Sequence, residues 1–159
     1  MEFLASIHSI TVHFPIVLLL SYVVLEIISA FSKKEIFSRA AHITLFLGVL
    51  AAFLAVFTGQ QALDLASKWE KAGAIMPLKA ISKHEDSANL TMWYFVAILI
   101  VRTFLVLKKK FTVNVKFMFV VLALLGAYFI YQTGKYGGKL VYKYGVGTEL
   151  KKAEIKNND

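Results

Sequence analysis

The sequence predicts an all-α membrane protein, an up-down bundle of four transmembrane helices with a Gly-rich outer loop after the fourth. Hydrophobic residues make up 58% of the 159-residue chain and the mean hydropathy is +0.64, whereas an ordinary soluble domain is roughly 45–50% apolar. Four apolar runs are each close to the roughly 20 residues that a helix needs to cross a bilayer. Two of the three connections are short, so consecutive helices should be antiparallel neighbours.

The four spans form one expected domain, residues 1–147, followed by a polar tail, residues 148–159. Inside a bilayer the backbone polar groups have no water to bond, so each run is expected to be a helix. The first run follows Glu2 rather than a basic segment and contains Glu26, so we interpret it as a retained span and not as a signal peptide. The expected spans are residues 12–31, 40–58, 89–107 and 113–131.

The distribution of charge predicts the orientation. The net charge of +8 comes largely from lysines and arginines beside the apolar runs, which is typical of topology signals and not of nucleic-acid binding. The two short turns are basic and the long connection, residues 60–88, is balanced. We therefore expect cytoplasmic short turns, with both termini on the outer side of the membrane. Three lysines of the tail oppose this orientation: Lys151, Lys152 and Lys156.

Small residues at helical spacing in the second span predict close helix packing. They are Ala41, Gly48, Ala52, Ala55 and Gly59. The second helix should continue beyond the membrane to about Ala72 and break at Gly73 and Pro77. A capping box, with Ser82 as N-cap and Glu85 reaching back, then predicts that the third helix starts outside the membrane.

An inner level of ionisable side chains is expected near the cytoplasmic ends of three spans. Glu26, His42 and Arg102 lie at similar depths, counted at about 1.5 Å per residue. Ionisable groups inside a membrane are costly and are functional candidates. In a structural interpretation, Glu26 and Arg102 form an ion pair and His42 is a neutral hydrogen-bonding partner. In a functional one, His42 is an axial ligand or proton-relay group, and Arg102 neutralises the carboxylate of Glu26 or of a cofactor.

An outer level contains the other three histidines, His8, His13 and His84. His8 and His13 are five residues apart, which would turn their rings about 140° from each other on one continuous helix, so we do not expect them to bind one atom together. Imidazoles from different helices of a bundle can hold a planar cofactor or a metal. The competing interpretation of each ring is a hydrogen-bonding group at the membrane interface.

A Gly-rich segment follows the fourth span, from Thr133 to Gly147. Its five glycines permit unusual backbone angles, so we expect a compact loop over the outer end of the bundle. Its lysines and tyrosines also suit contact with lipid head groups. The segment lacks the ending of a phosphate loop, and the chain has no cysteine, no nucleophile elbow and no HExxH motif.

In the motifs at its two ends, the chain resembles a bacterial family of small four-helix membrane proteins catalogued as a domain of unknown function. The family opens with His-Pro-x-x-Val-His-Phe-Pro-Ile, similar to His8–Ile16, and closes with Gly-Gly-x-Leu-Val-Tyr-x-His-Gly-Val-Gly, similar to Gly137–Gly147. Ser9 replaces the family's proline and Tyr144 replaces its closing-motif histidine. The resemblance covers nearly the whole chain and implies the same four-helix fold. It also implies a bacterial inner membrane, so the outer side, with both termini, would be the periplasmic side. Two further histidines of the family match His42 and His84.

The leading functional hypothesis is a membrane-embedded b-type haem protein that moves electrons between a membrane quinone or redox partner and the outer face. We expect His13 and His84 as the outer axial pair, with His8 as a further cofactor-binding candidate. His42 would serve a second, inner site only with a partner ligand, and Arg102 is a candidate to meet a propionate of haem b. The candidate metal ligands are accordingly His13, His42 and His84.

Two other classes of function stay open. One is a non-catalytic membrane subunit or scaffold, which would belong to a larger respiratory complex or a homo-oligomer. The other is a small carrier or proton path with Glu26, His42 and Arg102 as the relay. Four spans without broken helices or inverted repeats leave little room for alternating access, which counts against the carrier.

Overall fold

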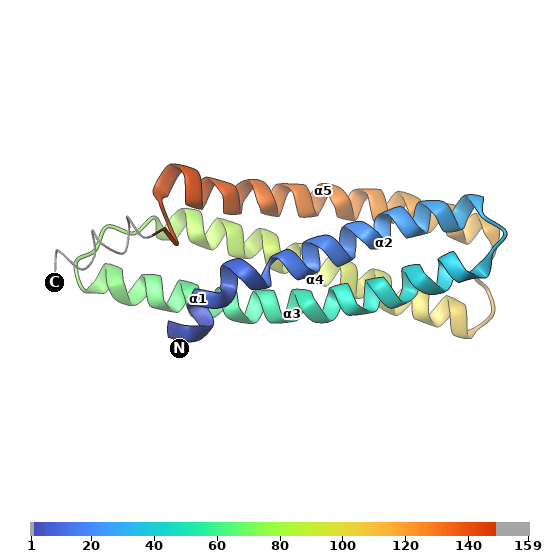
Figure 1. The fold of residues 1–159 in the computed structure, drawn as a ribbon, viewed down its shortest axis with the longest axis horizontal. Coiled ribbons are helices and arrows are strands. Elements are labelled where there is room, and N and C mark those ends of the chain that lie inside the picture. The colour runs from blue at the N-terminus through green and yellow to red at the C-terminus, as the bar shows by residue number, and fades with distance from the viewer. Residues whose placement is uncertain (1, 149–159) are drawn as a thin grey trace.

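The computed structural model is a bundle of four long helices with a short helix at the N-terminus, and it confirms the predicted fold class (Figure 1). It describes residues 2–148 except the side chain of Glu2, so most of the predicted polar tail, with its three lysines, lies outside the described residues. In the described part, four helical stretches are long and apolar enough to cross a membrane, α1 and α2 counting as one. The helices are α1 Glu2–Thr11, α2 His13–Phe31, α3 Glu35–Lys71, α4 Leu78–Leu107 and α5 Val113–Tyr144.

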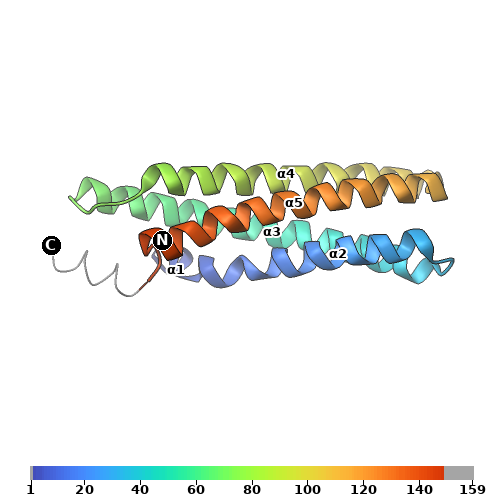
Figure 2. The same ribbon diagram turned by 90° about the horizontal axis from the view of Figure 1, so that it is seen from above.

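The connections alternate between the two ends of the bundle, as in an up-down topology (Figures 1 and 2). At one end, residues 32–34 join α2 to α3 and residues 108–112 join α4 to α5; we call it the short-turn end. At the other, residues 72–77 join α3 to α4, and the N-terminus and α1 lie there too; we call it the elbow end. α2 and α4 each pack against both α3 and α5, and α1 packs against α3.

The bend between α1 and α2 at Val12 is explained by Pro15. Proline has no N–H to donate to the carbonyl of Thr11, and its ring crowds that carbonyl, so the regular ladder of backbone bonds is interrupted there. Val12 nevertheless keeps right-handed helical angles, and its N–H donates to the carbonyl of His8 at 3.1 Å. As a result α1 turns away from the line of α2 and lies against α3 (Figure 1).

Apolar side chains fill the middle of the bundle and also cover much of its outside. Leu45, Phe95 and Phe119 are fully buried at the centre, whereas large side chains such as Leu54 and Val121 are more than half exposed. In water such a surface would be unfavourable, but in hydrocarbon it needs no covering. This pattern supports the expected contact with a lipid bilayer.

The small-residue stripe on α3 forms a helix contact, as predicted. Four of its five members are buried, and Gly48 is the tightest point, because a Cβ there would lie 2.6 Å from Cδ2 of Leu19 on α2. Without a hydrophobic effect between helices in lipid, such close approach is a main source of packing energy.

The elbow has the predicted break at Gly73, whose φ of 103° suits glycine and few other residues. The predicted capping box at Ser82 is wrong, because α4 begins earlier, at Leu78, directly after Pro77. A proline needs no hydrogen-bond acceptor for a backbone N–H and its φ is already close to helical, so it starts the helix about one turn before a side-chain cap at Ser82 would.

The Gly-rich segment does not form the predicted outer loop, because α5 continues through it to Tyr144. Only Gly145 (φ 65°) and Gly147 (φ 83°) take left-handed angles, and these two residues end the helix. Gly137 lies inside α5 and makes room for a neighbour, since a Cβ there would lie 3.1 Å from Cε1 of His84. Composition alone does not distinguish a glycine that turns the chain from one that admits a side chain from another helix.

We predict that Gly126→Ala destabilises the bundle. An added Cβ would lie 2.5 Å from Cζ of Phe95, a fully buried ring that meets Tyr22 and Tyr94 edge to face. Overpacking of this kind costs about 1–3 kcal/mol, so the unfolding midpoint in a denaturing-detergent titration should fall. Gly134→Ala is the control on the same helix, because no atom lies within 4 Å of its added Cβ and its midpoint should not fall. Equal midpoints for both variants would contradict the packing described.

Candidate functional site

Two of the predicted histidines meet at the elbow end. The rings of His8, on α1, and His84, on α4, have centroids 6.5 Å apart and planes inclined by 65°. Both residues are half-buried, and they are 76 positions apart in the sequence. We refer to His8 and His84 as the histidine pair.

Each ring of the histidine pair rests on a glycine of a third or fourth helix. A Cβ at Gly59, on α3, would lie 3.0 Å from Cε1 of His8, and one at Gly137, on α5, would lie 3.1 Å from Cε1 of His84. Both separations are tighter than ordinary van der Waals contact, so a larger residue would push the ring away. Four helices therefore surround the histidine pair: α1, α3, α4 and α5.

The hydrogen bonds of the histidine pair define which ring nitrogens are free. Nδ1 of His84 lies 3.2 Å from the backbone carbonyl of Thr133, which only accepts, so Nδ1 carries the proton. Nδ1 of His8 lies 3.0 Å from the hydroxyl of Thr58, and that hydroxyl donates to the carbonyl of Ala55, so it accepts from His8. In both neutral rings the lone pair is then on Nε2, the atom that would bind a metal.

A cluster of hydroxyls beside the pair joins α4 to α5. The Thr133 hydroxyl lies 2.9 Å from those of both Ser87 and Thr91, and it also approaches the carbonyl of Ser87 at 3.1 Å. The same short stretch of α5 supplies the carbonyl that holds His84. The network therefore fixes the height of His84 along the bundle.

The other histidines lie elsewhere. His13 is exposed on α2, so the ring contact with His84 comes from His8 and not from His13. His42 is half-buried on α3 toward the short-turn end. At the elbow end Gln60 donates a hydrogen bond to Glu85, which ties α3 to α4.

The ion pair that the sequence suggested between Glu26 and Arg102 is present and completely buried. Nε and one Nη of Arg102 donate to the same carboxylate oxygen of Glu26, at 3.2 and 2.9 Å, and both residues are 0% exposed. The same Nη donates to the carbonyl and hydroxyl of Ser38, at 3.1 and 3.2 Å, and the guanidinium lies 4.5 Å from the centre of the Phe111 ring. Arg102 is thus held by α2, α3 and the turn before α5.

Further polar groups surround this ion pair. Tyr22 and Ser29 share the buried face of α2 with Glu26, and His42 lies near Arg102 from α3. Together with Glu26 and Arg102 they form what we call the ion-pair cluster. The predicted inner level of Glu26, His42 and Arg102 therefore exists as a group in space.

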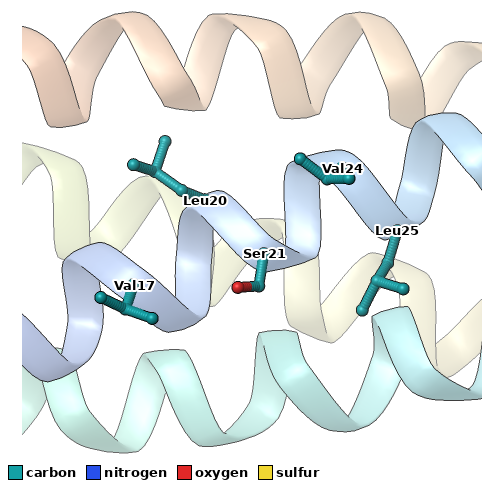
Figure 3. Close-up of a pocket in the computed structure, with 5 residues that line it drawn as sticks. All are labelled: Val17, Leu20, Ser21, Val24 and Leu25. Carbon is teal, nitrogen blue, oxygen red and sulfur yellow. The ribbon is translucent and has the colours of Figure 1, made fainter.

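A shallow groove on the outward face of α2 is unrelated to either cluster (Figure 3). Four aliphatic side chains and one serine line it, and all five belong to α2. Such a lining suits a lipid chain, and it contains no titratable group. The lining residues are Val17, Leu20, Ser21, Val24 and Leu25.

Within residues 2–148, no group of three His, Asp or Glu side chains is placed to hold a metal ion. The histidine pair instead brings two imidazole rings from different helices close together. A haem iron needs only axial ligands from the protein, because the porphyrin supplies the others.

The sequence did not reveal the residues that support the histidine pair. Gly59 was noted only for helix packing, and Gly137 only as part of an expected loop and of the family's closing motif. Thr58 and Thr133 were not identified, although a threonine within an apolar run is a polar group that needs a partner in lipid. That requirement was the available signal, but it does not say which partner is chosen.

Comparison with known proteins gives one similarity. A family model described as "Predicted membrane protein (DUF2231)" matches residues 5–150, a range that includes the histidine pair and the ion-pair cluster. No curated protein and no solved structure matches the chain significantly. The family description states a membrane location and no activity, so the function has to be argued from the two clusters.

We predict that Arg102→Leu destabilises the protein by about 3–5 kcal/mol, because it leaves the Glu26 carboxylate buried without its counter-ion. The double variant with Glu26→Leu should recover most of that loss in the same unfolding titration. Arg39→Leu is the control: Arg39 pairs with Glu35 at 3.3 Å, but both side chains are at least 75% exposed, so its removal should change the midpoint little. A double variant as unstable as Arg102→Leu alone would contradict this description.

Proposed function

We propose that this chain, which belongs to the DUF2231 family of predicted membrane proteins, is a b-type haem protein of the membrane. In this role it passes electrons between a membrane quinone or redox protein and the outer face. The observation that carries the proposal is the histidine pair: two imidazoles from different helices, close together, each with Nδ1 bonded and Nε2 free.

The chemistry of the pair fits axial ligation. Metal-bound histidines usually donate the other ring N–H to a carbonyl or similar acceptor, which fixes the tautomer and the ring orientation, and Thr133 and Thr58 provide such acceptors here. The rings of His8 and His84, with centroids 6.5 Å apart, are close enough together for both to hold one bound group.

The proposal assigns the axial role to His8 and His84, in place of the pairing of His13 with His84 expected from the sequence. His13 is exposed on α2, and it has no described contact with His84. Lys83, next to His84 in the chain, lies 4.9 Å from the centre of the Tyr136 ring and is a cation available to a haem propionate at this end. When bound, haem would supply the one-electron chemistry, and the chain would supply the ligands and a dry surrounding.

The location of the histidine pair in the bundle predicts which side of the membrane it would face. The basic short turns favour the cytoplasmic side by the positive-inside rule, so the elbow end, with the histidine pair, would face the periplasm of a bacterial inner membrane. An electron carrier near that surface would exchange electrons with quinone in the bilayer or with a protein docked outside.

We predict that His8→Ala and His84→Ala each abolish haem binding. The measurement is the haem-to-protein ratio by pyridine haemochromogen, together with reduced-minus-oxidised spectra of protein purified from haem-sufficient cells. His13→Ala is the matched control and should keep the wild-type ratio, with folding of all three checked by helix content in circular dichroism. Haem binding that survives His8→Ala but is lost in His13→Ala would restore the pairing of His13 with His84, and a haem-free wild type would contradict the function.

We also predict that Thr58→Val weakens haem affinity about 10–100-fold, as is typical when the hydrogen-bond partner of a metal-bound histidine is removed. The side chain keeps its size and loses the hydroxyl, which accepts from Nδ1 of His8 and donates to the backbone carbonyl of Ala55. Thr44→Val, on the same helix, removes a hydroxyl that donates to the backbone carbonyl of Ala40 and does not contact His8. It should leave the affinity unchanged. Equal haem affinities of both variants in a titration would show that Thr58 does not position His8.

A further inference from the structure

Within residues 2–148, four buried polar atoms of the ion-pair cluster have no hydrogen-bond partner. They are the Tyr22 hydroxyl, the second carboxylate oxygen (Oε1) of Glu26, the Ser29 hydroxyl and Nδ1 of His42. Tyr22, Glu26 and Ser29 are 0% exposed. Buried polar atoms in proteins are nearly always bonded to protein or to ordered water, so a group of four around one ion pair needs a physical explanation.

The four atoms belong to one region. Tyr22, Glu26 and Ser29 are spaced four and three residues apart, so they share one stripe of α2, and this stripe is buried along its length. His42 adds an imidazole from α3, and it is close enough to Arg102 for the two side chains to interact electrostatically. From α5, Lys116 donates to the carbonyl of Ser29 at 3.3 Å. All four long helices therefore meet at this level.

The chemistry of the unpartnered atoms indicates the ligand. Arg102 already balances the carboxylate of Glu26 and Lys116 adds a further positive charge nearby, so the site does not need a cation. An anion would be repelled by the carboxylate oxygen of Glu26 that lacks a donor. What is missing is a small neutral group that donates to the carboxylate oxygen and both donates to and accepts from the hydroxyls. Water has this capacity, and buried waters typically make about three hydrogen bonds to such groups.

We propose that the ion-pair cluster is an internal binding site for water, in which water bridges Tyr22, Glu26 and Ser29 beside Arg102. The site lies toward the short-turn end, because Ser29 lies two residues before the end of α2 and the half-buried Lys116 stands beside it. In the opposite direction Leu19, Leu45 and Phe95 close the bundle with apolar side chains. The site does not depend on the proposed haem, which would lie at the other end.

The chain has two arginines, Arg39 and Arg102. When the protein is labelled with ¹⁵N-arginine, each guanidinium gives its own signal, and the test compares these two signals. The full-length protein in lipid bilayers is measured by solid-state NMR with magnetisation transferred from water. Arg39 is exposed and gives the positive control. We expect clear transfer from water to the buried guanidinium of Arg102 as well.

Variants on one helix locate the water. Ser29→Ala removes a partner of the bridging water and should weaken the transfer to Arg102 several-fold, and Tyr22→Phe is the second variant if Ser29→Ala does not fold. Ser21→Ala is the matched control, since Ser21 lies on α2 in the outward groove and should leave the transfer unchanged (Figure 3).

A dry cluster has a different signature. Arg39 would receive magnetisation from water while Arg102 received none, and this result would overturn the proposal. Equal transfer to Arg102 in the Ser29→Ala and Ser21→Ala variants would overturn it as well. Haem spectra play no part in either readout, so the fate of the haem proposal does not affect this one.

Discussion

The structure depends on one constraint: inside a bilayer, a polar group has to find its partner within the protein. Backbone groups meet it by forming helices, and the few polar side chains meet it by gathering at two levels. One level is the buried Glu26–Arg102 ion pair near the short-turn end, and the other is the histidine pair with its threonines at the elbow end. Between them the core is apolar, from Leu19 on α2 to Phe95 on α4. The histidine pair and the buried ion pair are thereby about 27 Å apart along α4, counting the 18 residues from His84 to Arg102 at about 1.5 Å each.

The same constraint explains what the sequence could predict. Spans, connections, topology and the inner level of Glu26 and Arg102 follow from apolar runs and from the rarity of charge within them. The elbow break follows from Gly73 and Pro77, because both residue types interrupt a helix. These features depend on local composition or on depth along a helix, and both can be counted from the chain.

Contacts between helices could not be predicted in the same way. The pairing of His84 with His8 instead of His13 depends on the bend that Pro15 introduces and on which face of α1 meets α3. Likewise, Gly137 was expected in a loop, but it lies inside α5 and makes room for the ring of His84. The sequence does not show this role, because His84 is 53 positions away. Depth counts placed three histidines at one level, but the rotation of each helix decides which of them touch, and a single sequence does not contain that rotation.

The central claim is that His8 and His84 are the two axial ligands of one haem. The most direct measurement is the low-temperature electron paramagnetic resonance spectrum of the oxidised wild-type protein, which distinguishes six-coordinate iron with two imidazoles from five-coordinate iron. The account predicts a low-spin ferric signal with bis-imidazole character, which is lost on replacing His8 and kept on replacing His13. A high-spin five-coordinate signal, or no ferric haem signal in haem-replete protein, would contradict it.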